Sequence, residues 1–256
     1  MAGFEIIYGT NPVLEVMRAG KRRCHEVLVA SGRRGRELSA IEEAASGSGV
    51  TLRRVARDEV AKLANTEKHQ GVAARCDPFP YSTLEAIIDE ALSDPRKGFI
   101  VVLDGVTDPQ NLGSIARTAH LMGVHGIFLP RDNAASVNPT VVKSSAGATE
   151  HLPISQVTNV AQTLSYIKDR GFWVFGAAGE TGESLYMHDF KGDNVAIVLG
   201  AEGVGMRRLV KERCDQLLSI PMEGKIGSYN VSVAGALFMG EVARQRWLLS
   251  LAKTMP

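Results

Sequence analysis

IPMEGKIGSYNVSVAGAL, residues 220–237, is the stretch from which the rest of the chain is best interpreted. It begins with a short apolar strand, continues as a loop rich in glycine and serine, and ends in an apolar helix. Gly224, Gly227 and Ser228 leave backbone groups uncovered, so a ligand can approach them closely. The helix expected from about Val231 to Leu249 is too apolar for a surface helix, so it must pack against its own core or a second subunit. A polar loop between a buried strand and a buried helix is a common ligand site in α/β proteins.

The composition is that of a folded protein with one large or two modest domains, because 45% of the 256 residues are hydrophobic. No apolar run reaches the ~18 residues that a membrane span requires, and the first residues do not resemble a signal peptide. The three cysteines lie far apart, and neither they nor the six histidines show metal-ligand spacing. We therefore expect no metal, no membrane association and a reducing, cytoplasmic location.

Charge is distributed unevenly along the chain. Residues 1–76 contain 13 Lys and Arg against 9 Asp and Glu, whereas residues 77–256 contain 16 against 19. The basic residues of the first third cluster at predicted turns, notably at Arg22 and Arg23 and again at Arg33 and Arg34. This pattern favours contact with a polyanion such as RNA through these four arginines. Charge alone is equally compatible with an ordinary solvated surface.

The hydrophobic pattern changes near residue 98 and divides the chain. Residues 1–76 alternate short strands and helices, as in a small α/β domain. Residues 77–97 form a linker and a connecting helix, which we expect to start with a capping box at Ser82. Residues 98–256 begin with the apolar run FIVVLDGV (residues 99–106), which predicts a buried strand, and further strands are predicted at 126–129, 172–177, 195–199 and 217–220. Helices between such strands indicate a parallel α/β sheet, for which these patterns alone predict an unknotted, doubly wound topology.

Three loops that follow strands of this sheet carry the candidate chemistry. The first contains Asn111, a predicted helix N-cap, and Arg117; the second contains Glu202; and the third contains Ser228 and Asn230. Each residue has an ordinary structural alternative, such as a cap, a surface charge or, for Glu202, an ion pair with one of the two arginines at 207 and 208. Their coincidence at the ends of strands in one sheet favours a single site.

A nicotinamide site is the first alternative for these glycine-rich loops. Gly203-x-Gly205 would need a third glycine at position 208, which is Arg208, and no suitable acidic residue follows about 20 residues later. The phosphate-binding pattern G-x-x-x-x-G-K-[ST] is also missing from the sequence. These departures disfavour a nicotinamide-dependent oxidoreductase.

The three loops resemble the motifs of the SpoU group of RNA ribose 2′-O-methyltransferases, namely NLGSIART, VLGAEGVGM and IPMEGKIGSYNVSVA. The resemblance covers the chain from about Phe99 onward, and GTNPVLEVMR and HQGVAARC in the first third resemble the small substrate-binding domain of these enzymes, which is related to kink-turn-binding ribosomal proteins. It implies S-adenosylmethionine as the methyl donor, a C-terminal trefoil knot and a homodimer. The resemblance is strongest to enzymes acting on guanosine in large-subunit (23S) rRNA. A transfer RNA guanosine 2′-O-methyltransferase and a non-catalytic RNA-binding protein are the alternatives.

The resemblance also implies roles for individual residues. Arg117 would stabilise the 2′-oxygen as its proton leaves, Asn111 would hold Arg117 or the ribose, and Glu202 would orient Arg117 or an arginine of the partner chain. Ser228 and Asn230 would bind the ribose or the methionine end of the cofactor. The cofactor pocket would be built from Ala177, Leu199, Gly200, Ile220, Met222, Tyr229, Ser232 and Ala234. Tyr229 replaces the leucine that is commoner in this pattern.

Overall fold

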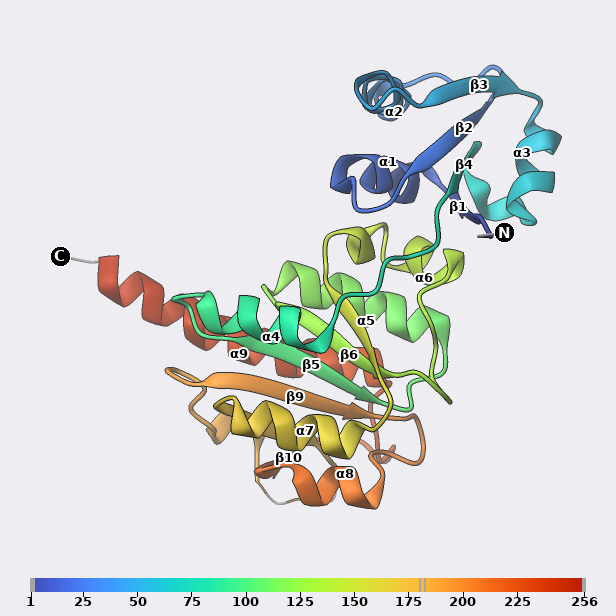
Figure 1. Ribbon diagram of the computed structural model, residues 1–256. Helices are drawn as coiled ribbons and strands as arrows, with labels where there is room; N and C mark the ends of the chain where they lie inside the picture. The colour runs from blue at the N-terminus through green and yellow to red at the C-terminus, as the bar shows by residue number, and fades with distance from the viewer. Residues whose placement is uncertain (1–2, 180, 182, 255–256) are drawn as a thin grey trace. The chain divides into compact units, whose positions relative to one another are not determined.

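The computed structural model describes residues 3–179, 181 and 183–254, and its chain divides by contacts into two compact units (Figure 1). The N-terminal unit consists of the chain up to Pro80 together with residues Ser136–His151. The C-terminal unit consists of Tyr81–Ala135 and the chain from Leu152 onward. Residues 136–151 thus pack with the first unit although they lie within the range we predicted for the second domain.

The N-terminal unit is built on a four-stranded mixed sheet in the order β1-β4-β2-β3. β4 runs antiparallel to β1 and β2, whereas β2 and β3 are parallel. The strands are β1 (Glu5–Tyr8), β2 (Cys24–Ala30), β3 (Thr51–Val55) and β4 (Val72–Cys76). Its helices are α1 (Thr10–Ala19), α2 (Arg36–Gly47), α3 (Arg57–Ala64) and α6 (Pro139–Ser144). The alternating α/β pattern predicted for this region is present, with boundaries shifted by one or two residues.

Arg22 is buried in the N-terminal unit, contrary to the expectation that it contacts RNA. Its guanidinium forms a two-pronged ion pair with Glu150, at 3.0 and 2.6 Å, and a third bond to Glu5 at 2.6 Å. The side chains of Arg22 and Glu150 are each only 1% exposed. A guanidinium enclosed in this way is not available to RNA. Within the basic run at residues 21–23, Arg22 therefore serves to hold the N-terminal unit together.

Replacing Glu150 with alanine should destabilise the protein strongly, because it leaves the buried guanidinium of Arg22 with Glu5 as its remaining carboxylate. We expect the free energy of unfolding to fall by about 3 kcal/mol, measured by urea denaturation. Glu42 provides a control, because its ion pair with Arg54 is roughly half exposed and Glu42→Ala should cost less than about 1 kcal/mol. Equal effects of the two substitutions would contradict this account.

The C-terminal unit contains a six-stranded sheet in the order β10-β8-β9-β5-β6-β7, and every pairing in it is parallel. The strands are β5 (Phe99–Asp104), β6 (Gly126–Pro130), β7 (Ile154–Val157), β8 (Phe172–Ala177), β9 (Asn194–Gly200) and β10 (Gln216–Leu218). The predicted parallel α/β sheet is confirmed. The edge strand β7 was not predicted, because four residues with two polar side chains give no clear apolar run.

Helices cover both faces of this sheet. They are α4 (Leu84–Ser93), α5 (Pro109–Leu121), α7 (Val160–Asp169), α8 (Arg208–Arg213) and α9 (Val231–Thr254). Apolar residues of α4, α7 and α8 pack in one cluster with alternate strand residues such as Val102 and Val198. Successive strand residues point to opposite faces, and on the other face α9 approaches Leu199 and Ile115 so closely at Gly235 that a Cβ there would lie 2.7 Å from the leucine side chain.

Two helices start differently from our prediction. α5 begins at Pro109 with Asp108 as its N-cap, so Asn111 lies in the first turn and is not the cap. α4 is capped by Thr83, whose side chain accepts a bond from the Ala86 amide, and not by Ser82. An aspartate followed by proline is a favourable helix start, which explains the first shift.

The long helix α9 combines a buried and an exposed side. Phe238, Met239 and Val242 are buried, whereas Trp247 is 63% exposed. Thus α9 packs on the core of its own unit and still presents apolar side chains to the outside near its end. None of the helices in the described part of the chain, α9 included, has the length and apolar character needed to cross a membrane.

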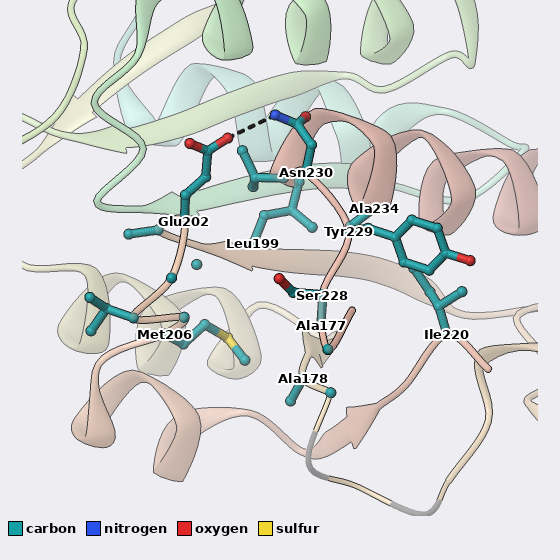
Figure 2. Close-up of a pocket in the computed structure, with 18 of the residues that line it drawn as sticks. Ala177, Ala178, Leu199, Glu202, Met206, Ile220, Ser228, Tyr229, Asn230 and Ala234 are labelled. Atoms are coloured by element: carbon teal, nitrogen blue, oxygen red, sulfur yellow. Dashed lines mark hydrogen bonds between the residues drawn. The ribbon is translucent and has the colours of Figure 1, made fainter. Parts of the chain in front are cut away.

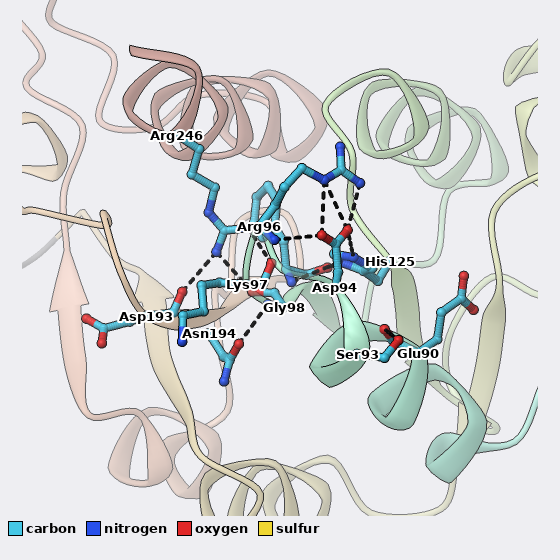
Figure 3. A network of polar contacts seen from close by, with 11 residues as sticks. Glu90, Ser93, Asp94, Arg96, Lys97, Gly98, His125, Asp193, Asn194 and Arg246 are labelled. Atoms are coloured by element: carbon cyan, nitrogen blue, oxygen red, sulfur yellow. Dashed lines mark hydrogen bonds and ion pairs between the residues drawn. The ribbon is translucent and has the colours of Figure 1, made fainter. Parts of the chain in front are cut away.

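A polar network anchors the far end of α9 to the beginning of the sheet (Figure 3). Arg246 donates hydrogen bonds to the carbonyl oxygens of Lys97, Gly98 and Asp193 at 2.9–3.0 Å. Burial lowers the pKa of Arg246 to about 10. Beside it, the carboxylate of Asp94 accepts bonds from Arg96 and from the imidazole of His125. These contacts fix the start of β5 and the end of α9.

Asp94 should make the stability of the protein depend on acidity. Hydrogen bonds from Arg96, and more weakly from His125, hold the pKa of Asp94 well below its usual range. Its stabilising contribution is therefore complete above the unfolded-state pKa of about 3.9 and is lost as the pH falls below that value. Asp94→Asn should lower the free energy of unfolding by about 1–2 kcal/mol at pH 7, with the difference from wild type shrinking toward pH 2. Asp189→Asn, at an exposed and loosely paired carboxylate, should show no such change.

Candidate functional site

A cavity of about 670 Å³ opens where three loops of the C-terminal unit meet at the carboxyl end of its sheet (Figure 2). The end of β8 and the residues after it form one wall, and the end of β9 and the loop after it form another. The third is formed by the segment between β10 and α9. The residues that line it are Ala177–Gly179, Leu199–Met206, Lys211, Leu218, Ile220, Met222, Gly227–Val231, Ala234 and Phe238. Cavities of ~300–1,000 Å³ with apolar walls and a few polar groups commonly bind small ligands.

The polar groups converge on the carboxylate of Glu202 at the edge of this cavity. Its Oε1 accepts hydrogen bonds from the side-chain amides of Asn111, at 2.5 Å, and Asn230, at 2.8 Å. Asn230 also donates to the Oδ1 of Asn111 at 3.1 Å, and Figure 2 shows Asn230 reaching Glu202 from the start of α9. Three loops that are distant in sequence are thus joined by one closed set of hydrogen bonds.

Glu202 does not form the ion pair that was its structural alternative. Arg207 pairs with Asp104, and Arg208 pairs with Glu212. The hydrogen bonds of the glutamate go to neutral amides, so its negative charge remains available to a cationic ligand or substrate group at the cavity. The resemblance to the family implied Arg117 or a partner's arginine as the group that Glu202 orients, whereas among the described residues its hydrogen-bond partners are the two asparagines.

The loop after β9 depends on glycine. Gly203 and Gly205 have φ values of 75° and 72°, which favour glycine. The amide and carbonyl groups of Ala201 and Gly205 bond to each other in both directions, at 2.8 and 3.1 Å. At Gly200, a Cβ would lie 2.2 Å from the backbone nitrogen of Met206. The chain can therefore fold back on itself here only if residue 200 has no side chain.

Asn230 holds the third wall at the beginning of α9. Its Oδ1 accepts bonds from the backbone amide of Ser232, at 2.9 Å, and from its hydroxyl, at 2.6 Å. Asn230 is thus the N-cap of α9, and one side chain serves both the helix and the polar network. Ser232, predicted to lie in the cofactor pocket, does not line the cavity and instead supports Asn230.

The other predicted cofactor residues lie at the cavity. Its wall includes Ala177, Leu199, Gly200, Ile220, Met222, Tyr229 and Ala234. It also includes residues that the sequence did not single out, among them Met206, Lys211 and Phe238. Met206 is the last residue of the quoted motif VLGAEGVGM and could have been included on that ground. Phe238 lies two turns inside α9, and no sequence pattern places it.

Arg117 lies apart from this cavity, on the exposed side of α5. The helix rises ~1.5 Å per residue, so Arg117 is about 12 Å along the axis from Pro109. Within the described residues, the Arg117 side chain has no hydrogen bond or ion pair. It is therefore free to contact a group supplied by a substrate or by another chain.

In the N-terminal unit, a second hollow of about 420 Å³ is lined by Arg33, Arg34 and Arg54 near the start of α2. Arg34 is exposed, whereas Arg33 is half-buried and donates to the Gln70 carbonyl and the Thr10 hydroxyl. Arg23 is exposed beside the buried Arg22. Of the four arginines predicted to bind RNA, three therefore remain accessible in part or in full.

Comparison with known proteins gives a consistent result across the chain. The model of the SpoU rRNA Methylase family matches residues 98–240, and that of the RNA 2′-O ribose methyltransferase substrate-binding domain matches residues 6–82. The sequence is 39% identical over 247 residues to the 23S rRNA (guanosine-2′-O-)-methyltransferase RlmB of Ralstonia nicotianae, covering 96% of this chain and 98% of the relative. It is 38% identical to RlmB of Escherichia coli K12, covering 94% and 99%.

A solved structure shows the same fold. The SpoU methyltransferase AviRb from Streptomyces viridochromogenes, in complex with the cofactor AdoMet, aligns with a TM-score of 0.80 at 23% identity, covering 96% of this chain and 92% of that one. The family models, the near full-length relatives and the shared architecture agree, and this chain belongs to the SpoU rRNA methylase family.

Proposed function

We propose that this protein is an enzyme that transfers a methyl group from S-adenosylmethionine to the ribose 2′-hydroxyl of a guanosine in 23S rRNA. The observation that carries the proposal is the closed network of Asn111, Glu202 and Asn230 at the mouth of the cavity. It unites the three motifs of the family, and the named relatives with this activity match almost the whole chain. A nicotinamide cofactor has no comparable support, since the glycine loop lacks the dinucleotide pattern.

The residues present fit S-adenosylmethionine. The side chains of Leu199, Ile220 and Phe238 provide apolar surface for the adenine, and Tyr229 can cover a ring. Glu202 and Asn230 provide the polar end of the cavity, where a carboxylate suits a cationic sulfonium or ammonium group. When bound, the cofactor supplies an electrophilic methyl group on sulfur. The AviRb structure, of the same fold, holds this cofactor.

The chain's own residues then act on the RNA. The guanidinium of Arg117 stabilises the 2′-oxygen as negative charge develops on it. Asn111 and Glu202 hold in position the part of the site that faces the substrate ribose. Ser228 and Asn230 bind that ribose or the methionine end of the cofactor. Arginine does not readily accept a proton, so the proton of the 2′-hydroxyl passes to another group, such as a phosphate of the substrate.

The N-terminal unit would bring the RNA to this site. Arg23, Arg33 and Arg34 offer positive charge for phosphate contacts, and the hollow beside α2 can receive part of the backbone. Residues 1–76 would form this RNA-binding domain, residues 77–97 the connection, and residues 98–256 the methyltransferase domain. Transfer RNA is the alternative substrate within the same chemistry, and RNA binding without catalysis is a further alternative.

The finer architecture follows the family. The C-terminal chain would form a trefoil knot, which is supported by the contact of residues 218 and 219 with the loop after β8, through Ala178 and Leu185. Homodimerisation would cover the exposed apolar side chains of α9, including Trp247 and Leu248. The three cysteines of the chain are free, as expected in a reducing compartment. An enzyme with such cysteines that modifies ribosomal RNA would work in the cytoplasm.

The proposal is tested by methyl incorporation from labelled S-adenosylmethionine into unmodified 23S rRNA and, separately, into unmodified transfer RNA. Label in the 23S rRNA is expected. Label confined to transfer RNA would keep the chemistry and change the substrate, whereas cofactor binding without label in either RNA would favour the non-catalytic alternative.

A further inference from the structure

Asp104 is the one charged residue in the described strands of the six-stranded sheet, and its side chain is fully buried. It stands at the carboxyl end of β5, in register with Gly200 at the end of β9. Gly200 is the residue at which the glycine loop begins. This carboxylate takes no part in the proposed mechanism.

Both oxygens of Asp104 bond to Arg207, the residue at which the same loop ends. Oδ2 accepts a hydrogen bond from the backbone amide of Arg207 at 2.7 Å, Oδ1 accepts one from Nε at 2.7 Å, and Nη2 lies 2.5 Å from Oδ1 in the ion pair. Asp104 therefore lies beside the first residue of the loop and binds its last. The intervening residues, Ala201–Met206, all line the cavity.

We infer that Asp104 and Arg207 are positioning residues that hold the glycine loop closed, so that the cavity keeps its wall and Glu202 keeps its place against Asn111 and Asn230. The inference deepens the proposed function and rests on it. It concerns how the site is kept in shape, and neither residue is assigned contact with the reacting atoms.

The loop needs this ion pair to hold its conformation, because few hydrogen bonds form within the loop itself. Glu202, Gly203 and Val204 are exposed, and the backbone bonds inside the described loop are those between Ala201 and Gly205 and one from Val204 to the Glu202 carbonyl. Glycine-rich backbone has many alternative conformations in solution, and holding one of them requires directional contacts. Two charge-assisted hydrogen bonds and an ion-pair contact to a rigid strand provide them.

Stability alone is a poor explanation for this ion pair. Enclosing a carboxylate carries a large desolvation cost, and apolar residues of similar volume often stabilise a fold as well or better. Apolar residues in place of this ion pair would form no directional hydrogen bonds. A buried carboxylate bonded to one backbone amide and one guanidinium specifies where residue 207 lies, and with it the end of the loop.

The test compares two neighbouring arginines. Arg207→Ala removes the guanidinium from Asp104, and because the Arg207 side chain is 63% exposed the core is left intact. Arg208→Ala removes an arginine whose side chain is 79% exposed and pairs with Glu212 on the surface. The dissociation constant of S-adenosylmethionine is measured by titration calorimetry, and Tm and kcat at saturating cofactor are measured alongside.

We expect Arg207→Ala to raise the dissociation constant about tenfold or more and to lower kcat at saturating cofactor as well, together with a lower Tm, because the buried carboxylate of Asp104 loses its charged partner. Arg208→Ala should remain within about twofold of wild type in all three quantities. Asp104→Asn should reproduce the cofactor defect, and the double variant should bind no more weakly than the weaker single variant, because both substitutions break the same contact.

An Arg207→Ala variant that matches wild type in cofactor affinity and kcat would overturn the inference. So would a loss of Tm with unchanged affinity and kcat, which would reveal a purely structural pair. Failure of the proposed function is distinguishable from these results, because the wild-type protein itself would then bind no S-adenosylmethionine or would bind it and methylate neither RNA. If Asp104→Asn does not fold, the cofactor affinity and kcat of Arg207→Ala, compared with those of Arg208→Ala, still test the inference.

Discussion

Replacing Arg117 with alanine should leave cofactor binding intact and reduce methyl transfer by about 10²–10³-fold, the loss expected when one charge-stabilising donor is removed. Cofactor binding should persist because Arg117 does not line the cavity. Folding should persist because the side chain is exposed and, among the described residues, unpaired. The measurements are calorimetric titration with S-adenosylmethionine and single-turnover methylation of RNA.

Arg117→Lys is the matched variant. Lysine retains the positive charge but loses the planar set of donors, so we expect intermediate activity with unchanged Tm. Full activity of Arg117→Ala would remove this residue from the mechanism. Weak RNA binding combined with a normal rate at saturating RNA would instead assign Arg117 to substrate binding alone.

Gly200→Ala should reduce cofactor affinity by about 100-fold or more, which corresponds to about 2.7 kcal/mol. The added Cβ would lie 2.2 Å from the Met206 nitrogen and 2.3 Å from the Gly205 carbonyl carbon. Both neighbours are backbone atoms of the same tight loop, so the loop itself must move. That movement displaces the cavity wall and draws Glu202 away from the two asparagines.

Gly47→Ala is the control for a glycine substitution without a clash. Gly47 is the last residue of α2, and a Cβ there meets nothing within 4 Å. It should leave affinity unchanged and stabilise the protein slightly, by about 0.5–1 kcal/mol, as alanine does in a helix. If Gly200→Ala bound the cofactor as wild type does, the loop described here would not be the conformation that binds.

The sequence predicted well what depends on local pattern. Apolar runs placed five of the six strands of the parallel sheet, and the third motif placed Asn230 at the start of α9. Glycine spacing marked the loop after β9, because positive φ at Gly203 and Gly205 leaves few other residues possible. The residues of the cofactor pocket came from the resemblance to the family, and seven of the eight line the cavity.

What the sequence left open depends on contacts between distant residues. The basic run at residues 21–23 has the composition of a surface turn, and only the position of Glu150, 128 residues away, shows that Arg22 is buried. The sequence around Glu202 does not indicate which groups donate hydrogen bonds to its carboxylate. Its pairing with Asn111 follows from a helix that starts at Pro109, three residues before the start we expected.

The measurement that tests the central claim most directly is nucleoside analysis of 23S rRNA methylated in vitro. Unmodified 23S rRNA is incubated with the protein and S-adenosylmethionine, digested to nucleosides and examined by mass spectrometry, with the Arg117→Ala protein as the parallel sample. The account predicts 2′-O-methylguanosine from the wild-type protein and almost none from the variant. Methylation on a base, or the same yield of 2′-O-methylguanosine from both proteins, would contradict it.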